Sequence, residues 1–141
     1  LTLPTPDVTT VLVVDDNPEM ALFYRRAARG TGYRIVAAQR GAEVMPLVEA
    51  TAPSIIVLDV MLPDVDGWRL LMRLREHPLT RTIPVVVCSV VRDAQLALSL
   101  GAAAYLAKPV APQEFIRTLE RLRPPAAPGS ASPPADSAAA A

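Results

Sequence analysis

The chain alternates between short, continuous apolar runs and longer stretches in which apolar residues recur at helical spacing. Runs of about four to eight apolar residues bounded by turn residues are typical of strands buried on both faces. The predicted strands are Val11–Val14, Tyr33–Ala37, Ile55–Leu58, Ile83–Cys88 and Ala104–Ala107. Because strands alternate with helices, the pattern predicts an α/β fold, a doubly wound five-stranded parallel sheet with helices on both faces.

Capping and turn residues mark the helices between these strands. Asn17 suits the N-cap of the first helix, and Pro18 suits its first position. Pro46 falls inside the weaker helical pattern of residues 41–51, which predicts either a late helix start near Val44 or a kink. Further helices are expected over residues 68–76, over residues 93–100 and from residue 112 onward.

The length of 141 residues suits one domain with a real core. We expect residues 1–9 to be a linker and residues 10–123 to form the domain. Residues 124–141 are rich in Pro and Ala and lack large apolar side chains, so we expect them to be disordered. The chain does not begin with Met, and we therefore expect it to be a piece of a longer protein.

Composition and charge exclude several classes of partner. The 14 basic and 14 acidic residues balance, which argues against nucleic acid or a membrane surface as a binding partner. No apolar run approaches 18 residues and no signal-peptide pattern is present, so we expect a cytoplasmic protein. The lone Cys88 is expected to be a small core residue, and His77 an exposed residue at a helix end rather than a ligand.

Polar residues follow four of the predicted strands. They are Asp15 and Asp16, Asp59, Ser89 and Lys108. Right-handed crossovers bring the carboxyl ends of parallel strands to one edge of the sheet, so these side chains should converge. An Asp after a strand is most often only a cap or turn residue, and it is the convergence that favours chemistry at Asp59.

The residue types at this edge suit phosphoryl transfer. Three carboxylates close together need a cation at neutral pH, and oxygen ligands without His or Cys favour Mg²⁺ or Mn²⁺ over zinc. Lys108 is the one Lys among 14 basic residues, and its compact ammonium suits a single phosphate oxygen. With a metal and a lysine neutralising the phosphoryl oxygens, Asp59 could attack phosphorus in line and form an acyl phosphate.

Residues 10–123 resemble the receiver (CheY-like) domain of bacterial two-component response regulators. The motifs that carry the resemblance are Val13-Val14-Asp15-Asp16-Asn17, Leu58-Asp59-Val60-Met61-Leu62-Pro63 with Asp66-Gly67, Val87-Cys88-Ser89, and Gly101-Ala102 with Tyr105-Leu106-Ala107-Lys108-Pro109. The resemblance implies the flavodoxin-like strand order 2-1-3-4-5 and a cis bond between Lys108 and Pro109.

The resemblance also implies a role for each site residue. Asp59 is then the phosphoacceptor. Asp16 and Asp59 ligate Mg²⁺ directly together with the backbone carbonyl of Met61, and Asp15 acts through water.

Two further side chains would act on the phosphoryl group, and one would respond to it. Ser89 and Lys108 would each bind a phosphoryl oxygen. Tyr105 would be the aromatic switch that turns inward as Ser89 is drawn to the phosphoryl group, which changes the face formed by helix 4, strand 5 and helix 5.

Three features depart from the family pattern. Val90 follows Ser89 where the family usually has Ala or Gly, and it could narrow access to the phosphoryl group. The separation of Ser89 and Gly101 is shorter than in single-domain chemotaxis members, which shortens the helix 4 region. Pro46 disturbs helix 2. The shortened pattern resembles receivers attached to hybrid histidine kinases, so we favour a C-terminal receiver of a longer protein.

The resemblance implies a histidine kinase or phosphotransfer domain as partner, in the same polypeptide if the chain is part of a hybrid kinase. No turnover enzyme is implied, only a phosphoacceptor with slow autodephosphorylation. A homodimer through helix 4, strand 5 and helix 5 stays open.

Two rival functions fit the sequence less well. A phosphorylation-independent binding module with the same fold would tend to lose one of the site residues. A Mg²⁺-dependent phosphohydrolase would place a second Asp where this chain has Met61.

Overall fold

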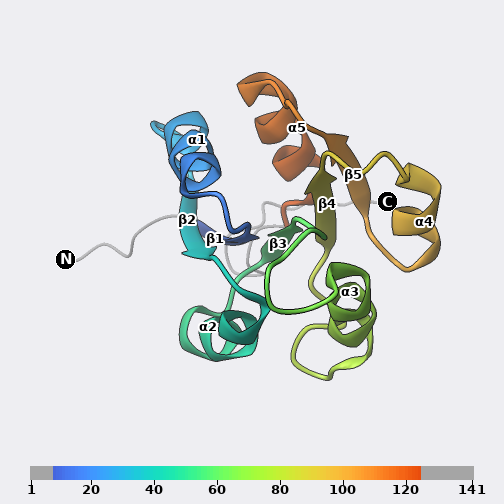
Figure 1. The fold of residues 1–141 in the computed structure, drawn as a ribbon. Coiled ribbons are helices and arrows are strands. Elements are labelled where there is room, and N and C mark those ends of the chain that lie inside the picture. Colours follow the sequence, from blue (N-terminus) through green and yellow to red (C-terminus); the bar gives the residue numbers. More distant parts are fainter. Residues whose placement is uncertain (1–7, 125–141) are drawn as a thin grey trace, which may run out of the picture.

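A computed structural model describes residues 8–124 of the chain (Figure 1). The elements are β1 (Thr9–Val14), α1 (Pro18–Ala28), β2 (Tyr33–Ala38), the 3₁₀ helix η1 (Gly41–Glu43), α2 (Val44–Thr51), β3 (Ile55–Leu58), α3 (Gly67–Glu76), β4 (Val85–Ser89), α4 (Ala94–Ser99), β5 (Ala104–Ala107) and α5 (Pro112–Leu122). Strand β1 begins at Thr9, inside the segment predicted as a linker. The expectations for residues 1–7 and 125–141 lie outside the described residues.

The five strands form one parallel sheet in the order β2-β1-β3-β4-β5, which confirms the predicted fold class and strand order. Figure 1 shows α1 and α5 on one side of the sheet and α2 and α3 on the other. All residues of β3 and β4 are buried, as expected for strands covered by helices on both faces.

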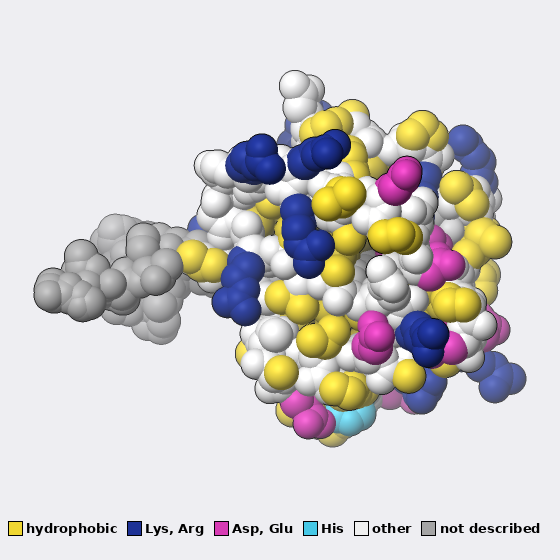
Figure 2. Space-filling view, turned by 60° about the vertical axis from the view of Figure 1, so that its left-hand side comes forward, with side chains coloured by type: hydrophobic (Ala, Val, Ile, Leu, Met, Phe, Trp, Pro, Cys, Tyr) yellow, Lys and Arg dark blue, Asp and Glu magenta, His cyan; other side chains and the backbone are white. Residues whose placement is uncertain are grey.

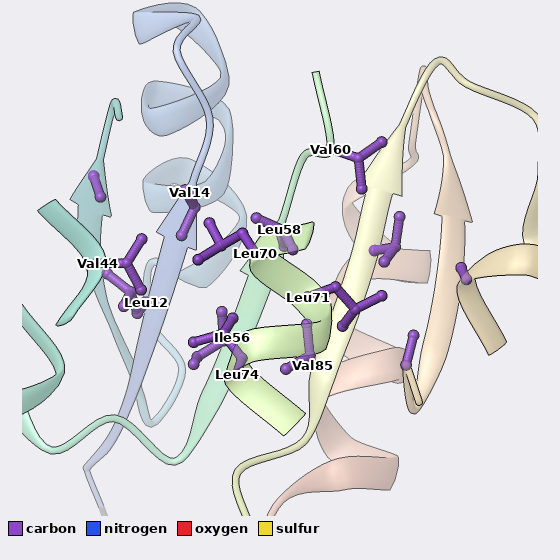
Figure 3. Close-up of a cluster of buried hydrophobic side chains, with 14 of the residues drawn as sticks. Leu12, Val14, Val44, Ile56, Leu58, Val60, Leu70, Leu71, Leu74 and Val85 are labelled. Carbon is purple, nitrogen blue, oxygen red and sulfur yellow. The ribbon is translucent and has the colours of Figure 1, made fainter. Parts of the chain in front are cut away.

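The core on the α2–α3 side of the sheet, here called the aliphatic face, is built from branched apolar side chains (Figure 3). Its buried members are Leu12, Val14, Ala38, Val44, Val48, Ile56, Leu58, Val60, Leu70, Leu71, Leu74, Val85, Val87, Ala97 and Ala102. Figure 3 shows Leu70, Leu71 and Leu74 of α3 lying over side chains of the sheet. Helix α4 contributes only Ala97 as a buried residue.

The core on the opposite side, here called the aromatic face, packs α1 and α5 against the sheet. Its buried members are Val11, Val13, Tyr24, Ala28, Tyr33, Ile55, Val57, Val86, Cys88, Leu106, Val110, Phe115 and Leu119. The rings of Tyr24 and Phe115 have centroids 4.8 Å apart, and those of Phe23 and Tyr24 are 5.5 Å apart. Both distances lie in the range of favourable aromatic pairs.

Local signals explain where several elements begin. Asn17 accepts a hydrogen bond from the amide of Glu19 and caps α1 as predicted. Of the two alternatives for residues 41–51, the late start is confirmed, because α2 begins at Val44. Pro46 is therefore in the first turn of α2, where a backbone amide has no acceptor within the helix. Strand β4 begins at Val85 rather than Ile83, after Pro84.

The lone cysteine and the lone histidine lie where the sequence predicted. Cys88 is buried in the aromatic face, and His77 is exposed at the end of α3, where its Nδ1 accepts a hydrogen bond from the amide of Leu79. Figure 2 shows apolar side chains scattered among charged ones of both signs on one face. Within residues 8–124, no helix is long and apolar enough to span a membrane.

Candidate functional site

Two adjacent strands carry the carboxylates at the centre of the site. Val14 at the end of β1 pairs with Leu58 at the end of β3, so the next residues, Asp15 and Asp59, lie side by side. The amide of Asp59 donates to the carbonyl of Val14 at 2.9 Å, which continues the sheet by one residue. Asp15 and Asp59 are buried, with exposed fractions of 4% and 7%, whereas Asp16 is exposed.

These acidic residues can hold a metal ion. Carboxylate oxygens of Asp15, Asp16 and Asp59 lie within 4.8 Å of one another, so a single cation can reach all three. Oxygen-only ligands on a partly exposed cluster suit a hard divalent ion such as Mg²⁺, which usually keeps several water ligands. The donor set thus fits the predicted ion.

Lys108 lies between the two buried carboxylates. Its Nζ is 2.6 Å from Oδ2 of Asp15 and 2.8 Å from Oδ2 of Asp59. Burial raises the pKa of Asp15 above its usual value, although the hydrogen bond from Lys108 opposes this. Burial alone would lower the pKa of Lys108, but its hydrogen bonds to both carboxylates outweigh burial and raise it. Lys108 therefore carries a positive charge at neutral pH.

Each buried carboxylate is also fixed by a backbone amide two residues further along the chain. The amide of Asn17 donates to Oδ1 of Asp15, and the amide of Met61 donates to Oδ1 of Asp59, both at 2.9 Å. The side chain of Met61 is exposed, so this residue acts at the site through its backbone. The orientation of Asp59 thus depends on where the loop after β3 holds Met61.

Ser89 and Tyr105 both bind the backbone of one residue of the β4–α4 loop, Val91. The hydroxyl of Ser89 accepts from the amide of Val91 at 3.2 Å, and the hydroxyl of Tyr105 donates to the carbonyl of Val91. Ser89 is fully buried, and its own carbonyl accepts from the amide of Lys108 at 3.1 Å. A movement of Ser89 would therefore reach Tyr105 through Val91.

The structure places the predicted site residues at the carboxyl edge of the sheet or on the loops beside it, except Tyr105, which lies within β5. Asp15, Asp59 and Lys108 are in direct contact, and Asp16 completes the carboxylate cluster. The bond between Lys108 and Pro109 is cis, as expected. The functional roles of these residues stay predictions.

Two features that were expected to modify the site are also visible. Val90 is 58% exposed directly after Ser89, so it lies at the surface of the loop rather than in the core. Helix α4 has only six residues, consistent with a shortened helix 4 region.

One contact of this edge was not predicted from the sequence. The carboxylate of Asp64 accepts hydrogen bonds from the amides of Gly41 and Ala42, at 2.9 and 3.0 Å. It joins the loop after β3 to the start of η1. No local pattern in the sequence predicts this contact, because Asp64 lies 23 positions from Gly41 and next to Pro63 in an apparent turn.

Comparison with known proteins agrees with this geometry. Residues 11–120 match the family model described as the response regulator receiver domain. An uncharacterized 14.6 kDa protein of Leptolyngbya boryana is 35% identical over 114 residues, which cover 79% of this chain and 87% of that protein. The transcriptional regulatory protein TrcR of Mycobacterium tuberculosis is 34% identical over 79% of this chain and 44% of its own length. PhoP of Bacillus subtilis, the alkaline phosphatase synthesis transcriptional regulatory protein, is 34% identical over 85% of this chain and 52% of its own length.

Solved structures show the same fold. The receiver domain of the sensor histidine kinase PA1611 of Pseudomonas aeruginosa, which has a magnesium ion in its active site cleft, superposes with a TM-score of 0.71 at 26% identity. That match covers 81% of this chain and 96% of the PA1611 domain. The BeF3-activated receiver domain of Klebsiella pneumoniae RstA has a TM-score of 0.74 at 25% identity, over 82% of this chain and all of that domain. The chain spans about half the length of TrcR and PhoP.

Proposed function

The chain belongs to the response regulator receiver family, and we propose that it works as a phosphoacceptor switch in a two-component phosphorelay. In this proposal Asp59 accepts a phosphoryl group from a phosphohistidine of a kinase or phosphotransfer domain. The observation that carries the proposal is the position of Lys108, whose ammonium contacts both Asp15 and Asp59 beside a cluster of carboxylates that fits Mg²⁺. A module that only bound partners would not need this arrangement.

The proposed reaction is a transfer between two nucleophiles. A carboxylate oxygen of Asp59 forms a bond to phosphorus while the bond between phosphorus and the histidine nitrogen breaks, and that nitrogen keeps the electron pair and later takes a proton. Asp15, Asp16, Asp59 and the carbonyl of Met61 would hold Mg²⁺, which would neutralise charge on the phosphoryl oxygens. Lys108 and the hydroxyl of Ser89 would each stabilise one phosphoryl oxygen.

We propose that the response to phosphorylation passes through Val91. If the hydroxyl of Ser89 turns to the phosphoryl group, it gives up the hydrogen bond from the amide of Val91. The carbonyl of the same residue holds Tyr105. Tyr105 could then turn inward and change the face formed by α4, β5 and α5, where an output partner or a second copy of the chain could bind.

The partner and setting are proposed at the level of the family. A histidine kinase or a phosphotransfer domain would supply the phosphoryl group. Likeness to the receiver domain of a sensor histidine kinase supports a place within a hybrid kinase. In the cytoplasm such a receiver would undergo one phosphorylation per signal and slow hydrolysis rather than enzymatic turnover.

The test is phosphorylation measured by intact mass. With Mg²⁺ and a small phosphodonor, or a cognate kinase, the chain should gain about 80 Da, the mass of one phosphoryl group on a carboxylate nucleophile. Asp59→Asn should gain nothing. Asp93→Asn is a matched control, because Asp93 is an exposed carboxylate that caps α4 and lies outside the acidic cluster.

Two results would contradict the proposal. Equal labelling of Asp59→Asn and the unaltered chain would remove Asp59 as the phosphoacceptor. No labelling by any kinase, together with no effect of Mg²⁺ on the fluorescence of Trp68 just after the Asp59 loop, would favour the binding module instead.

A further inference from the structure

The loop between β3 and α3, residues 59–66, is fastened at both of its ends. At the start, the amide of Met61 donates to the carboxylate of Asp59. At the end, the carboxylate of Asp66 accepts from the amide of Trp68 and caps α3, and the amide of Gly67 donates to the carbonyl of Val60 at 3.2 Å. Gly67 permits this approach, because a Cβ there would lie 2.2 Å from the Cα of Val60.

A third attachment holds the middle of the loop to a different element. Asp64 binds the amides of Gly41 and Ala42, the first two residues of η1. Helix η1 has no cap of its own, because the side chain of its N-cap residue Arg40 makes no capping hydrogen bond. Asp64 therefore supplies the cap from a distant part of the sequence, and its charge is favourable beside the free amides of a helix start.

Close packing supports the same contact. A Cβ on Gly41 would lie 2.3 Å from Cγ2 of Val65, so Gly41 and Val65 are already as near as a glycine allows. Val65 also packs against the core of the aliphatic face. The amides of Gly41 and Ala42 lower the pKa of Asp64 below its usual value, so its carboxylate is charged at neutral pH.

We propose that Asp64 is a positioning residue for the metal and phosphorylation site. By holding the loop to η1, it keeps the backbone of Met61 in place, so that the amide of Met61 orients Asp59 and its carbonyl would be held for the proposed Mg²⁺. The inference rests on the proposed function, because it assigns a role in that site. Asp64 touches neither the metal nor the phosphoryl group and acts through the loop.

The first test compares Asp64→Ala with Asp64→Asn. Both variants remove the charge, but Asn keeps one acceptor for the amides of η1. For Asp64→Ala we expect the Mg²⁺ dissociation constant to rise about 3- to 10-fold, near the lower end of the range for residues that orient metal ligands. Asp64→Asn should recover part of that loss. Mg²⁺ binding is followed by the fluorescence of Trp68 and by calorimetry, and Asp93→Ala controls for the loss of an exposed capping carboxylate.

The second test disturbs the contact without changing charge. Gly41→Ala introduces the methyl that meets Val65, a stiff β-branched side chain, and should also weaken Mg²⁺ binding. Val65→Ala removes the obstructing methyls, so the double variant should bind Mg²⁺ more tightly than Gly41→Ala alone. Such a recovery shows that the two positions are coupled.

Amide hydrogen exchange without metal supplies an independent readout. In Asp64→Ala the amide of Met61, three positions from the substitution, should exchange at least about 3-fold faster, because local opening of the loop becomes easier. A purely structural role for Asp64 would expose the amides of Gly41 and Ala42 and leave Met61 as it is.

Three outcomes would overturn the inference. One is wild-type exchange at Met61 in Asp64→Ala. Another is an unchanged Mg²⁺ dissociation constant in both Asp64→Ala and Gly41→Ala. The third is an equal loss of Mg²⁺ affinity in Asp64→Ala and Asp64→Asn with no loss in Gly41→Ala. That result would mean that only the charge of Asp64 affects Mg²⁺ binding. If the unaltered chain binds no Mg²⁺, the proposed function fails, and the exchange measurement still decides whether Asp64 positions the loop.

Discussion

The two faces of the sheet are built differently. On the aromatic face, α1 and α5 have 11 residues each, and Tyr24, Tyr33 and Phe115 are buried against the sheet. On the aliphatic face, α2, α3 and α4 have 8, 10 and 6 residues. Among the described residues, the buried members of that core are aliphatic throughout. One face thus buries aromatic rings beside two 11-residue helices, and the other buries only aliphatic side chains beside helices of 6 to 10 residues, with Trp68 and Tyr105 partly buried against them.

The contacts that bear on the proposed switch lie on the aliphatic side of the sheet, where α4 buries only Ala97. Tyr105 packs against the aliphatic core, and its hydroxyl reaches the loop that leads into α4. The Asp64 contact joins two segments at the edge of the same face. Elements with few buried contacts open at low free-energy cost, whereas well-packed elements open only with the whole domain. We therefore expect the rings of the aromatic face to contribute strongly to stability and α4, on the other side, to open locally.

The largest effect is expected for Phe115→Ala, which tests the contribution of the aromatic face to stability. Phe115 is fully buried and contacts the rings of Phe23 and Tyr24, so its loss should lower the free energy of unfolding by about 3–5 kcal/mol. Urea denaturation measures the change. Met72→Ala on α3, where the side chain is 40% exposed, is the control and should stay within about 0.5 kcal/mol of the unaltered chain. A loss below about 1 kcal/mol for Phe115→Ala would contradict a strong contribution of the aromatic face to the free energy of unfolding.

A second test measures local stability directly. Amides of α4 should exchange hydrogen at least about tenfold faster than those of α5, because α4 buries only Ala97 and can open without unfolding the domain. Nuclear magnetic resonance exchange at residue level makes the comparison. Equal protection of the two helices would mean that both open only with the whole domain. This result would contradict a difference in local stability between the two faces.

Alkaline pH should act mainly on buried groups of the aromatic face. Burial raises the pKa of Tyr33 to about 12 and raises the pKa values of Tyr24 and Cys88 as well, and all three belong to the aromatic face. A raised pKa in the folded state stabilises the protein fully below the unfolded value and is lost as pH rises through the folded value. For Tyr33 that window runs from pH 10.0 to about 12.

We therefore expect the free energy of unfolding to fall from about pH 9 upward, where the thiol begins to titrate, with a steeper loss above pH 10. Lys108 adds to the loss above pH 10.5, because its pKa is raised too. In Tyr33→Phe the free energy of unfolding, measured by circular dichroism, should fall less between pH 10 and 12 than in the unaltered chain. An unchanged curve in that variant would contradict burial of a neutral Tyr33 as a cause.

The smallest effect is expected for Tyr105→Phe. The substitution removes the hydrogen bond to the carbonyl of Val91 and keeps the ring, so global stability should fall by about 1 kcal/mol or less. Amides of the β4–α4 loop should exchange faster, whereas those of α1 and α5 should not change. A loss of protection across the aromatic face would show that the two sides are coupled through Tyr105.

Much of the fold could be predicted because its signals are local. Apolar runs and capping residues such as Asn17 lie within a few positions of the elements that they define. The convergence of Asp15, Asp59 and Lys108 follows from the general rule that parallel strands end at one edge. The convergence of these three side chains could therefore be predicted from the sequence.

The remainder depends on contacts between distant segments. The start of β4 at Val85 and the 3₁₀ turn before Val44 are settled by backbone geometry rather than by apolar periodicity. Asp64 resembles an ordinary turn residue, and only the folded chain brings it to Gly41. The same holds for Val91, whose backbone amide and carbonyl contact Ser89 and Tyr105 although nothing in its side chain suggests this.

The order of strands also bears on solubility. It leaves β2 and β5 at the two edges of the sheet, where unpaired backbone groups could recruit a strand from another molecule and start aggregation. Strand β5 has only four residues and leads directly into Lys108 and Pro109. Strand β2 carries the exposed cation of Arg34. Short length on one edge and charge on the other are means by which natural sheets avoid joining edge to edge, so we expect this domain to resist growth of its sheet from chain to chain.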